Sequence, residues 1–475
     1  MPKDKSIRDP VHNFIVVPEK YKLLNLIDNE FIQRLRWISQ TPLEQFVYPG
    51  GTNTRFEHSL GCMYLAGIAA KTLWSFSDNN KVFSPVREFL KEAGSSRDTF
   101  IKSAMITGLL HDVGHSPFSH IVEFVSDYDH EKVGYFIAKH LLKKHKKCKK
   151  WVLDALDKDK PLKDINPVSS VLRTLIDGPI DIDKGDYLLR DSYHCGVTYG
   201  NYGQHRIWRN LAIVGGDEGK PVVGITEKAA HEAYHLLVSR FHMYKSVYQH
   251  HTRAKTDALL RFAFKFSALH DSSGEIFIPV KDESFFLNDN KKREFLFWND
   301  GAVLNSLNKM KVSGSSDVLR DILDKILKRK LPIESKIFST ITKKIPSGQK
   351  RAVRKQLGKE LNTIYEFANK ICEKEGKAVA IPYYDILEEP FQGEDLLEIK
   401  VYNEKKKASI RLAEFLGFNK EVLLSNALKN ESLFYATLVI KMFTYKENGI
   451  EILSRYKKRY LKKWKDMEKK MRGIF

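Results

Sequence analysis

Long apolar runs and paired cysteines are both absent from this chain of 475 residues. No stretch supplies the roughly 18 uncharged apolar residues of a membrane helix, and the polar segment Met1–Arg8 lacks the apolar core of a signal peptide. The four cysteines include no C-x-x-C pair, which argues against a thiolate zinc site and a disulfide framework. We therefore expect a cytoplasmic protein in a reducing compartment, without a membrane partner.

Acidic residues are also fewer than basic residues. The chain has 59 Asp and Glu against 79 Lys and Arg, a formal net charge of +20. A field of that sign favours anionic partners, either nucleotides or, weakly and through the basic surface, nucleic acid. Hydrophobic residues at 42% and charged residues at 29% are close to the globular average, which excludes a wholly disordered chain and a fibrous protein.

What the chain does contain is helical apolar periodicity, from Ile7 to about Leu269. Two short runs, Leu211–Val214 and Val222–Ile225, flank a glycine-rich turn and predict a β-hairpin inserted between helices. After about residue 275 the composition shifts toward lysine. The sequence thus predicts a mainly α fold, with a helical core over residues 1–270, a small β-hairpin insertion, and a mixed α+β regulatory or oligomerisation region over residues 275–475.

The last lysine-rich segment, Arg455–Arg472, has a regular aromatic pattern. Its ten Lys and Arg are interleaved with Tyr456, Tyr460 and Trp464 at helical spacing. Either the aromatic face docks a helix on the body of the protein while the lysines point to solvent, or aromatics and cations together bind single-stranded nucleic acid. The aromatic spacing favours docking.

Residues that suit metal chemistry occur in three segments. The adjacent pair His111–Asp112 follows a buried helical stripe, Ile101–Leu109. Imidazole beside carboxylate suits a first-row divalent metal, whereas calcium takes oxygen ligands; the alternative is a hydrogen-bonded core histidine. Arg55–Gly61 places His58 at the start of an apolar helical stretch, and Asp181–Asp191 packs four aspartates, a lysine and an arginine into one helical segment.

In chain order, His58, His111–Asp112 and Asp183 match the H…HD…D signature of the HD-domain phosphohydrolases. The strings RFEHSLG, LLHDVGHSPFSH and DIDKGDYLLRD resemble those of the sterile-alpha-motif and HD-domain dNTP triphosphohydrolase family and its bacterial, dGTPase-like relatives, as do Arg8–His12 and Phe31–Arg36. The resemblance covers residues from about 5 to about 265. The sterile-alpha-motif domain itself is missing, and no match extends past residue 275.

This resemblance implies an enzyme that hydrolyses a dNTP at the α-phosphorus into a deoxynucleoside and triphosphate. It assigns one divalent ion, Mn, Fe, Mg, Co, Ni or Zn, to His58, His111, Asp112 and Asp183. The catalytic group would be Asp183 with three histidines, His115, His120 and His130. Histidine both donates and accepts protons near pH 7, and His120 is the favoured donor to the leaving 5′ oxygen.

The resemblance also assigns seven substrate-binding residues. Three cations clamp the triphosphate, whose negative charge needs several partners, a Gln and an Asp hold the 3′ hydroxyl, and two tyrosines lie beside the sugar. The three cations are Arg55, Lys184 and Arg240. The residues for the 3′ hydroxyl are Gln40 and Asp191, and the two tyrosines are Tyr187 and Tyr248. The ring of Tyr248 would crowd the 2′ position and reject ribose, and plain core packing is its alternative role.

A second site is implied by Lys5, Asp28, Gln33 and Arg36. These residues match the positions at which regulated members of the family hold an activating guanine nucleotide at a subunit interface. Arg suits the acceptor atoms of guanine and Asp its N–H groups. The resemblance therefore implies activation by GTP or dGTP in a homodimer or tetramer, and the competing interpretation is an ordinary ion pair between Asp28 and Arg36.

Two other functions stay open from the sequence. One is an HD phosphodiesterase or nucleotidase with another phosphate substrate, for which Lys184 and Arg240 would be incidental. The other is a nucleic-acid-binding protein that uses the positive field and keeps a structural HD site. The salt dependence distinguishes the nucleic-acid-binding protein from the two enzymes. Nucleic-acid binding weakens steeply as the salt concentration rises, whereas enzymatic turnover should survive.

Overall fold

The structure, a computed structural model, describes residues 4–79, 85–92, 96–270, 276–312, 317–338, 340–346, 350–387, 393–418, 435–446 and 448–473. Its first part is mainly helical, as the apolar periodicity predicts. The elements up to residue 270 are β1 (Lys5–Asp9), β2 (Asn13–Val17), α1 (Leu24–Ile27), α2 (Glu30–Arg34), α3 (Arg55–Asn79), α4 (Pro85–Glu92), α5 (Arg97–Leu110), α6 (His120–Val125), α7 (His130–Leu141), α8 (Lys146–Leu156), α9 (Pro167–Ile176), α10 (Ile182–Cys195), α11 (Gln204–Trp208), β3 (Leu211–Gly215), β4 (Pro221–Thr226), α12 (Ala230–Met243) and α13 (His251–His270).

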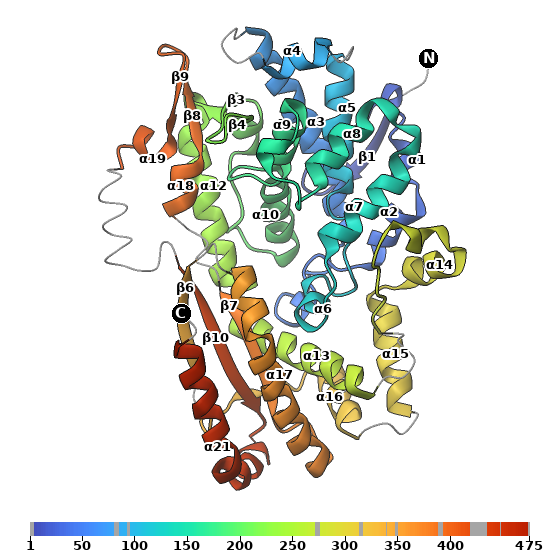
Figure 1. The fold of residues 1–475 in the computed structure, drawn as a ribbon, viewed down its shortest axis with the longest axis vertical. Helices are drawn as coiled ribbons and strands as arrows, with labels where there is room; N and C mark the ends of the chain where they lie inside the picture. The colour runs from blue at the N-terminus through green and yellow to red at the C-terminus, as the bar shows by residue number, and fades with distance from the viewer. Residues whose placement is uncertain are drawn as a thin grey trace.

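The later part mixes helices and strands. Its elements are α14 (Asp289–Phe297), α15 (Asp300–Val312), α16 (Asp317–Leu327), β5 (Ile333–Glu334), β6 (Ile341–Pro346), α17 (Lys350–Glu375), β7 (Ile381–Leu387), α18 (Gly393–Glu398), β8 (Lys400–Asn403), β9 (Ala408–Arg411), α19 (Leu412–Phe415), β10 (Tyr435–Thr444) and α21 (Gly449–Gly473). Figure 1 shows the blue-to-green helices gathered in the upper part, with α16, α17, β10 and α21 below them. The orange segment with β8 and β9 returns to the upper part beside β3 and β4. The mainly α fold with small sheets is confirmed.

Helices α3 and α5 pack against each other so closely that one of them needs a glycine at the contact. A Cβ atom on Gly108 of α5 would lie 2.7 Å from the carbonyl oxygen of Cys62 in α3, too near for any side chain. Most of α5 is buried, as its apolar stripe predicts. The contact sets the start of α3 beside the end of α5, where His58 and His111 lie.

The predicted hairpin is present and forms part of a larger sheet. Strands β3 and β4 pair antiparallel, with Leu211 opposite Ile225, and the apolar residues of β3 are buried. The sheet continues through β8, which pairs parallel to β4 with Ile225 opposite Val401, and ends at β9. The later part of the chain therefore completes a sheet that the earlier part begins.

The C-terminal helix α21 docks through its aromatic residues. Tyr456, Tyr460 and Trp464 are buried. The ring of Tyr460 lies 4.4 Å from that of Phe367 in α17, and Trp464 lies 5.2 Å from Phe338, centroid to centroid. The docking interpretation of this segment is confirmed. No helix in the described parts of the chain is both long enough and apolar enough for a membrane crossing.

Candidate active site

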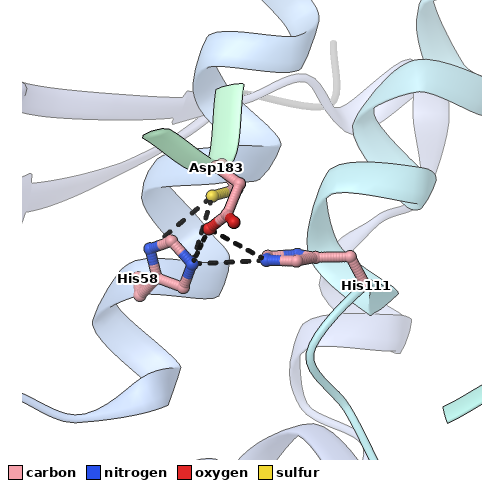
Figure 2. Close-up of side chains that lie close together, drawn as sticks. His58, His111 and Asp183 are labelled. Atoms are coloured by element: carbon pink, nitrogen blue, oxygen red, sulfur yellow. Dashed lines mark hydrogen bonds and ion pairs between the residues drawn. The ribbon is translucent and has the colours of Figure 1, made fainter. Parts of the chain in front are cut away.

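Three helices each bring one ligand-type side chain to a common point (Figure 2). His58 lies in the first turn of α3, His111 directly after α5, and Asp183 in the first turn of α10. The Oδ1 atom of Asp183 is 2.9 Å from Nε2 of His58 and 3.7 Å from Nε2 of His111, and the two Nε2 atoms are 3.2 Å apart. Two imidazole nitrogens and a carboxylate oxygen in this arrangement are a donor set for a divalent metal ion.

Hydrogen bonds orient both imidazoles with Nε2 toward this point. Nδ1 of His58 donates to Oδ2 of Asp186 at 2.8 Å, and Nδ1 of His111 donates to the carbonyl oxygen of Gly108 at 2.9 Å. Because Nδ1 carries a proton in each bond, Nε2 faces the cluster, and it offers its lone pair to a metal ion whenever the ring is neutral. The donor set therefore fits a metal ion in tautomer as well as in composition.

Asp186, which fixes His58, belongs to a buried network of charges. It also accepts hydrogen bonds from His12 at 2.7 Å and from Nε of Arg190 at 2.8 Å, and Arg190 pairs with Asp9 at 2.9 Å. The network reaches α3 because residue 61 is a glycine: a Cβ there would lie 1.8 Å from the Asp186 carboxylate. The sequence alone assigns no role to His12, Asp186 or Arg190, although the Asp-x-x-x-Arg spacing places Asp186 and Arg190 on one helix face.

Asp112 and Cys62 flank the cluster. The ligand atoms of His58, Cys62, His111 and Asp183 lie within 4.8 Å of one another, and burial raises the pKa of the Cys62 thiol. Oδ1 of Asp112 is 3.4 Å from Nε2 of His111, and its Oδ2 is 3.5 Å from Nε2 of His58 and pairs with Arg55. The structure thus brings the four predicted ligands together. It adds a thiol that its i, i+4 spacing from His58 could have indicated.

The charges around the cluster favour a cation. Burial alone would raise the pKa of Asp183, but hydrogen bonds from His111 and His58 hold it well below its ordinary value. Burial lowers the pKa of His58 and of His111. Cys62, Asp183 and Asp186 nevertheless raise the pKa of His58 well above the ordinary value of histidine, and Asp112 and Asp183 raise the pKa of His111. The negative charge that favours protonated imidazoles at His58 and His111 also attracts a divalent cation. The cation and the protons compete for the same nitrogen atoms.

The three predicted catalytic histidines lie together next to Asp112. The rings of His115 and His130 stack with centroids 3.8 Å apart, and His120 lies edge-on to both, at 5.1 and 5.3 Å. Nδ1 of His120 donates to Glu123 at 2.9 Å, and Nδ1 of His130 donates to the same carboxylate. Nε2 of His115 is 3.3 Å from Oδ1 of Asp112. Glu123, which the sequence analysis missed, therefore positions two of the three rings.

Most of the predicted sugar-binding residues also meet. The Tyr248 hydroxyl donates to Oδ2 of Asp191 at 2.7 Å, and Nδ2 of Asn53, another residue missed from the sequence, donates to Oδ1 at 2.8 Å. The rings of Tyr187 and Tyr248 are 6.1 Å apart. Gln40 and Tyr248 line one cavity of about 440 Å³, which also reaches His120.

The three predicted phosphate clamps already contact other groups. Arg55 pairs with Asp112 and donates through Nε to Ser119 at 2.9 Å. Lys184 pairs with Asp181 and donates to the carbonyl oxygen of Gly178 at 2.9 Å. Burial lowers the pKa of Lys184, Asp181 raises it above the ordinary value, and the charge of Arg240 opposes that rise. Arg240 therefore contributes to the electrostatic field at Lys184.

Three of the four residues predicted for a second nucleotide site line a separate cavity of about 570 Å³. Lys5, Asp28 and Arg36 line it, with Arg8 and Glu57. Gln33 accepts a hydrogen bond from Nε of Arg36 at 2.7 Å, and the guanidinium lies 3.6 Å over the ring of Phe56. Among the described residues, the contacts found for the Arg36 guanidinium are thus with Gln33 and Phe56 and not with Asp28.

Comparison with known proteins identifies the helical part. Residues 55–175 match the family described as HD domain, and residues 204–286 match the one described as HD associated region. An uncharacterized protein of Methanocaldococcus jannaschii is 36% identical over 259 residues, which are 54% of this chain and 49% of that protein. The deoxynucleoside triphosphate triphosphohydrolase SAMHD1 homolog of Dictyostelium discoideum is 28% identical over 302 residues, 59% and 51% of the two chains. The chain spans about half the length of these curated relatives.

A solved structure shares the fold beyond the helical part. The crystal structure of a phosphohydrolase from Bacteroides thetaiotaomicron aligns with a TM-score of 0.66 and 23% identity, over 94% of this chain and 100% of that one. At this identity the likeness concerns the fold alone. It extends past residue 275, where the sequence offered no resemblance.

Proposed function

We propose that this chain, which matches the HD domain over residues 55–175 and the HD associated region over residues 204–286, is a metal-dependent dNTP triphosphohydrolase. The reaction converts a dNTP and water into a deoxynucleoside and triphosphate. The observation that carries the proposal is the convergence of His58, His111 and Asp183, with both imidazole Nε2 atoms turned toward one point by hydrogen bonds at Nδ1. The distant similarity to a dNTP triphosphohydrolase supports the substrate class.

His58, His111, Asp112 and Asp183 would hold the ion. A divalent metal in such a site polarises a phosphoryl oxygen and makes bound water more acidic. Arg55, Lys184 and Arg240 bind the triphosphate, and Arg55 and Lys184 exchange their present carboxylate partners for phosphate oxygens. Because one of those carboxylates is Asp112, phosphate binding at Arg55 would leave Asp112 available as a ligand for the ion.

The histidines next to the proposed metal ligands would supply the proton that the leaving group needs. Glu123 holds Nδ1 of His120, so that Nε2 of this ring is available to the 5′ oxygen. His130, held by the same carboxylate, stacks on His115 and keeps the group in place. On this account His120 protonates the leaving deoxynucleoside.

Sugar selection belongs to the residues around Asp191. Oε1 of Gln40 is buried and accepts no hydrogen bond from the described residues, which leaves it available to the 3′ hydroxyl. Asp191 shares that role, while Tyr187 and Tyr248 fill the space beside the ring. A 2′ hydroxyl would meet the ring of Tyr248, so the site favours deoxyribose.

The second cavity would serve regulation by a nucleotide. The cavity lined by Lys5, Asp28 and Arg36 offers a guanidinium, an ammonium and a carboxylate, which suit a guanine nucleotide. Binding of GTP or dGTP there, with Gln33 orienting Arg36, would activate a homodimer or tetramer in the cytoplasm.

Product analysis tests the proposed reaction. The purified chain would be incubated with Mn²⁺ or Mg²⁺ and each dNTP alone, then with GTP or all four dNTPs, and the products separated by ion-pair chromatography. Deoxynucleoside together with intact triphosphate is the expected result, and a dependence on GTP or on the mixture identifies activation. Intact dNTPs under every condition would remove the proposal and favour a phosphodiesterase or nucleotidase with another substrate.

A further inference from the structure

The helix that carries His120 begins after two residues with left-handed backbone conformations. Phe118 has a φ of 54°, and Ser119, the N-cap of α6, has a φ of 50°. Residues other than glycine rarely adopt this conformation, and they persist in it only where the surrounding structure holds them. The side chain of Ser119 makes no capping hydrogen bond to α6. The position of His120 therefore depends on contacts that come from elsewhere in the chain.

The carboxylate of Asp300 supplies two of these contacts. Asp300 is the first residue of α15, in the later part of the chain. Its Oδ1 atom accepts a hydrogen bond from the Phe118 amide at 2.7 Å, and its Oδ2 atom accepts one from the Ser39 amide at 3.0 Å. Hydrogen bonds to a charged acceptor are stronger than neutral ones. One carboxylate thus connects the strained entry to α6 with the segment that leads to Gln40.

The same two segments also contact each other directly. The hydroxyl of Ser119 donates to the carbonyl oxygen of Ser39 at 2.8 Å. Ser119 precedes His120, the proposed donor to the 5′ oxygen. Ser39 precedes Gln40, the proposed partner of the 3′ hydroxyl. The contacts at this junction therefore set the distance between the groups that meet the two ends of the leaving sugar.

The later part of the chain also holds the other end of α6. The Tyr384 hydroxyl in β7 donates to the carbonyl oxygen of Phe124 at 2.9 Å, and the two rings lie 5.9 Å apart. Because α6 has only six residues, most of its carbonyl oxygens lack a partner within the helix. The contact from Tyr384 thus stabilises the turn that contains Glu123, which holds Nδ1 of His120.

We propose that Asp300 is a positioning residue for protonation of the leaving group, with Tyr384 in support. In that step water attacks the α-phosphorus and loses a proton to solvent, the P–O5′ bond breaks, and Nε2 of His120 donates a proton to the 5′ oxygen. Asp300 keeps this nitrogen within reach while Gln40 holds the 3′ hydroxyl. Misplacing a catalytic group by about 1 Å can cost on the order of 100-fold in rate. The inference rests on the proposed function.

The test compares two leaving groups in single-turnover experiments on the full chain with Mn²⁺. One substrate is dATP, and the other is the dATP analogue with sulfur in place of the 5′ bridging oxygen. The sulfur departs as a thiolate without a proton, because a thiol is far more acidic than an alcohol. We expect D300N to slow dATP cleavage about 10- to 100-fold and cleavage of the analogue less than about threefold. H120A should show the same pattern with a larger loss.

A milder variant and two controls accompany D300N. Y384F removes only a hydroxyl and should show the same dependence on the leaving group with a loss of about threefold to tenfold, so it carries the test if D300N does not fold. The control D217N changes a carboxylate that pairs with Lys400, and Y445F removes a hydroxyl that donates to the carbonyl oxygen of Lys330. Both controls should match the wild type with both substrates.

The double variant D300N/H120A separates a positioning role from a general loss of structure. If Asp300 acts through His120, the double variant should cleave dATP at the rate of H120A within about threefold. Equal losses of D300N with both substrates, or losses that add in the double variant, would overturn the positioning role and leave the proposed function standing. A wild type that releases no triphosphate from any dNTP would instead remove the proposed function, and the role in protonation with it.

Discussion

His58 depends for its orientation on Asp186, a residue 128 positions later in the chain. The hydrogen bond between them places the proton on Nδ1 and the lone pair of Nε2 toward His111 and Asp183. Asp186 in turn is held by His12 and Arg190. The candidate metal site therefore consists of the proposed ligands together with the groups that orient them.

Replacing Asp186 should weaken metal binding without touching a ligand. D186N removes the negative charge behind His58, and losses of such supporting groups typically reduce metal affinity by about 10–100-fold. Titration with Mn²⁺ measures the dissociation constant, and D98N, which changes an exposed ion pair with Lys20, is the control. Unchanged affinity in a folded D186N protein would show that the network has only a packing role.

Tyr248 should decide between deoxyribose and ribose. Y248A removes the ring that crowds the 2′ position, and we expect the ratio of kcat/KM for ATP to that for dATP to rise by about tenfold. Y248F keeps the ring and loses only the hydrogen bond to Asp191, so it should retain the bias against ATP. A ratio in Y248A that equals the wild-type ratio would count against a steric role.

Glu44 should make the stability of the protein depend on pH. Burial raises its pKa from 4.5 to about 7, an effect that Arg253 only partly offsets. Between these pH values the folded state keeps a proton that the unfolded state loses, so the free energy of unfolding falls as the pH rises through this window. E44Q lacks this loss.

The stability gain of E44Q over the wild type should therefore grow from near zero at pH 4.5 to about 3 kcal/mol at pH 8. Urea unfolding across this range measures it. The control E451Q changes an exposed carboxylate of α21 and should follow the wild type. A gain of equal size at every pH would contradict the raised pKa of Glu44.

Among the site residues, the sequence identifies the proposed metal ligands, which lie together in the structure, but not the residues that hold them in place. His58, His111–Asp112 and Asp183 stand in segments whose local strings identify them, and the structure brings them together. Asn53 and Glu123 are ordinary polar residues in the sequence, because their roles arise from hydrogen bonds that only the packed helices create. The assignment of substrate and second-site residues stays a prediction.

At the scale of elements, a local sequence pattern predicts a strand or a helix face when the residues of the pattern themselves make the contact. The β-branched runs that flank a glycine-rich turn become β3 and β4, and the aromatic spacing near the C-terminus becomes the buried face of α21. The parallel pairing of β4 with β8 was not predictable, because no local signal links strands so far apart in the chain. The same holds for β10, which pairs with β5, β6 and β7.

Trp464 should carry much of the docking of α21. W464A removes a buried ring that packs on Phe338, and truncations of this kind typically cost about 3–5 kcal/mol. K463A, the neighbouring exposed residue, should stay within about 0.5 kcal/mol of the wild type. Urea unfolding gives both values, and equal stability of the two variants would contradict the docked arrangement.

At the scale of the whole molecule, the later part of the chain completes the earlier part. Arg34, which is buried, donates hydrogen bonds to the carbonyl oxygens of His115, Phe295 and Trp298 and so connects the loop after the HD motif to α14. Strand β8 extends the hairpin sheet, and β7 and β10 line the cavity beside the proposed sugar site. The division at residues 270–275 stays a prediction, because composition shows where the character of the chain changes and not how its parts pack.

The central claim is that one divalent ion held by His58, His111, Asp112 and Asp183 makes this molecule a hydrolase. Metal content of the Mn²⁺-loaded, desalted protein, measured by mass spectrometry, tests it most directly. We expect about one equivalent per chain in the wild type and a content near zero in the double variant H111A/D112A, with its helical circular dichroism preserved. A double variant that retains the wild-type metal content would contradict the account.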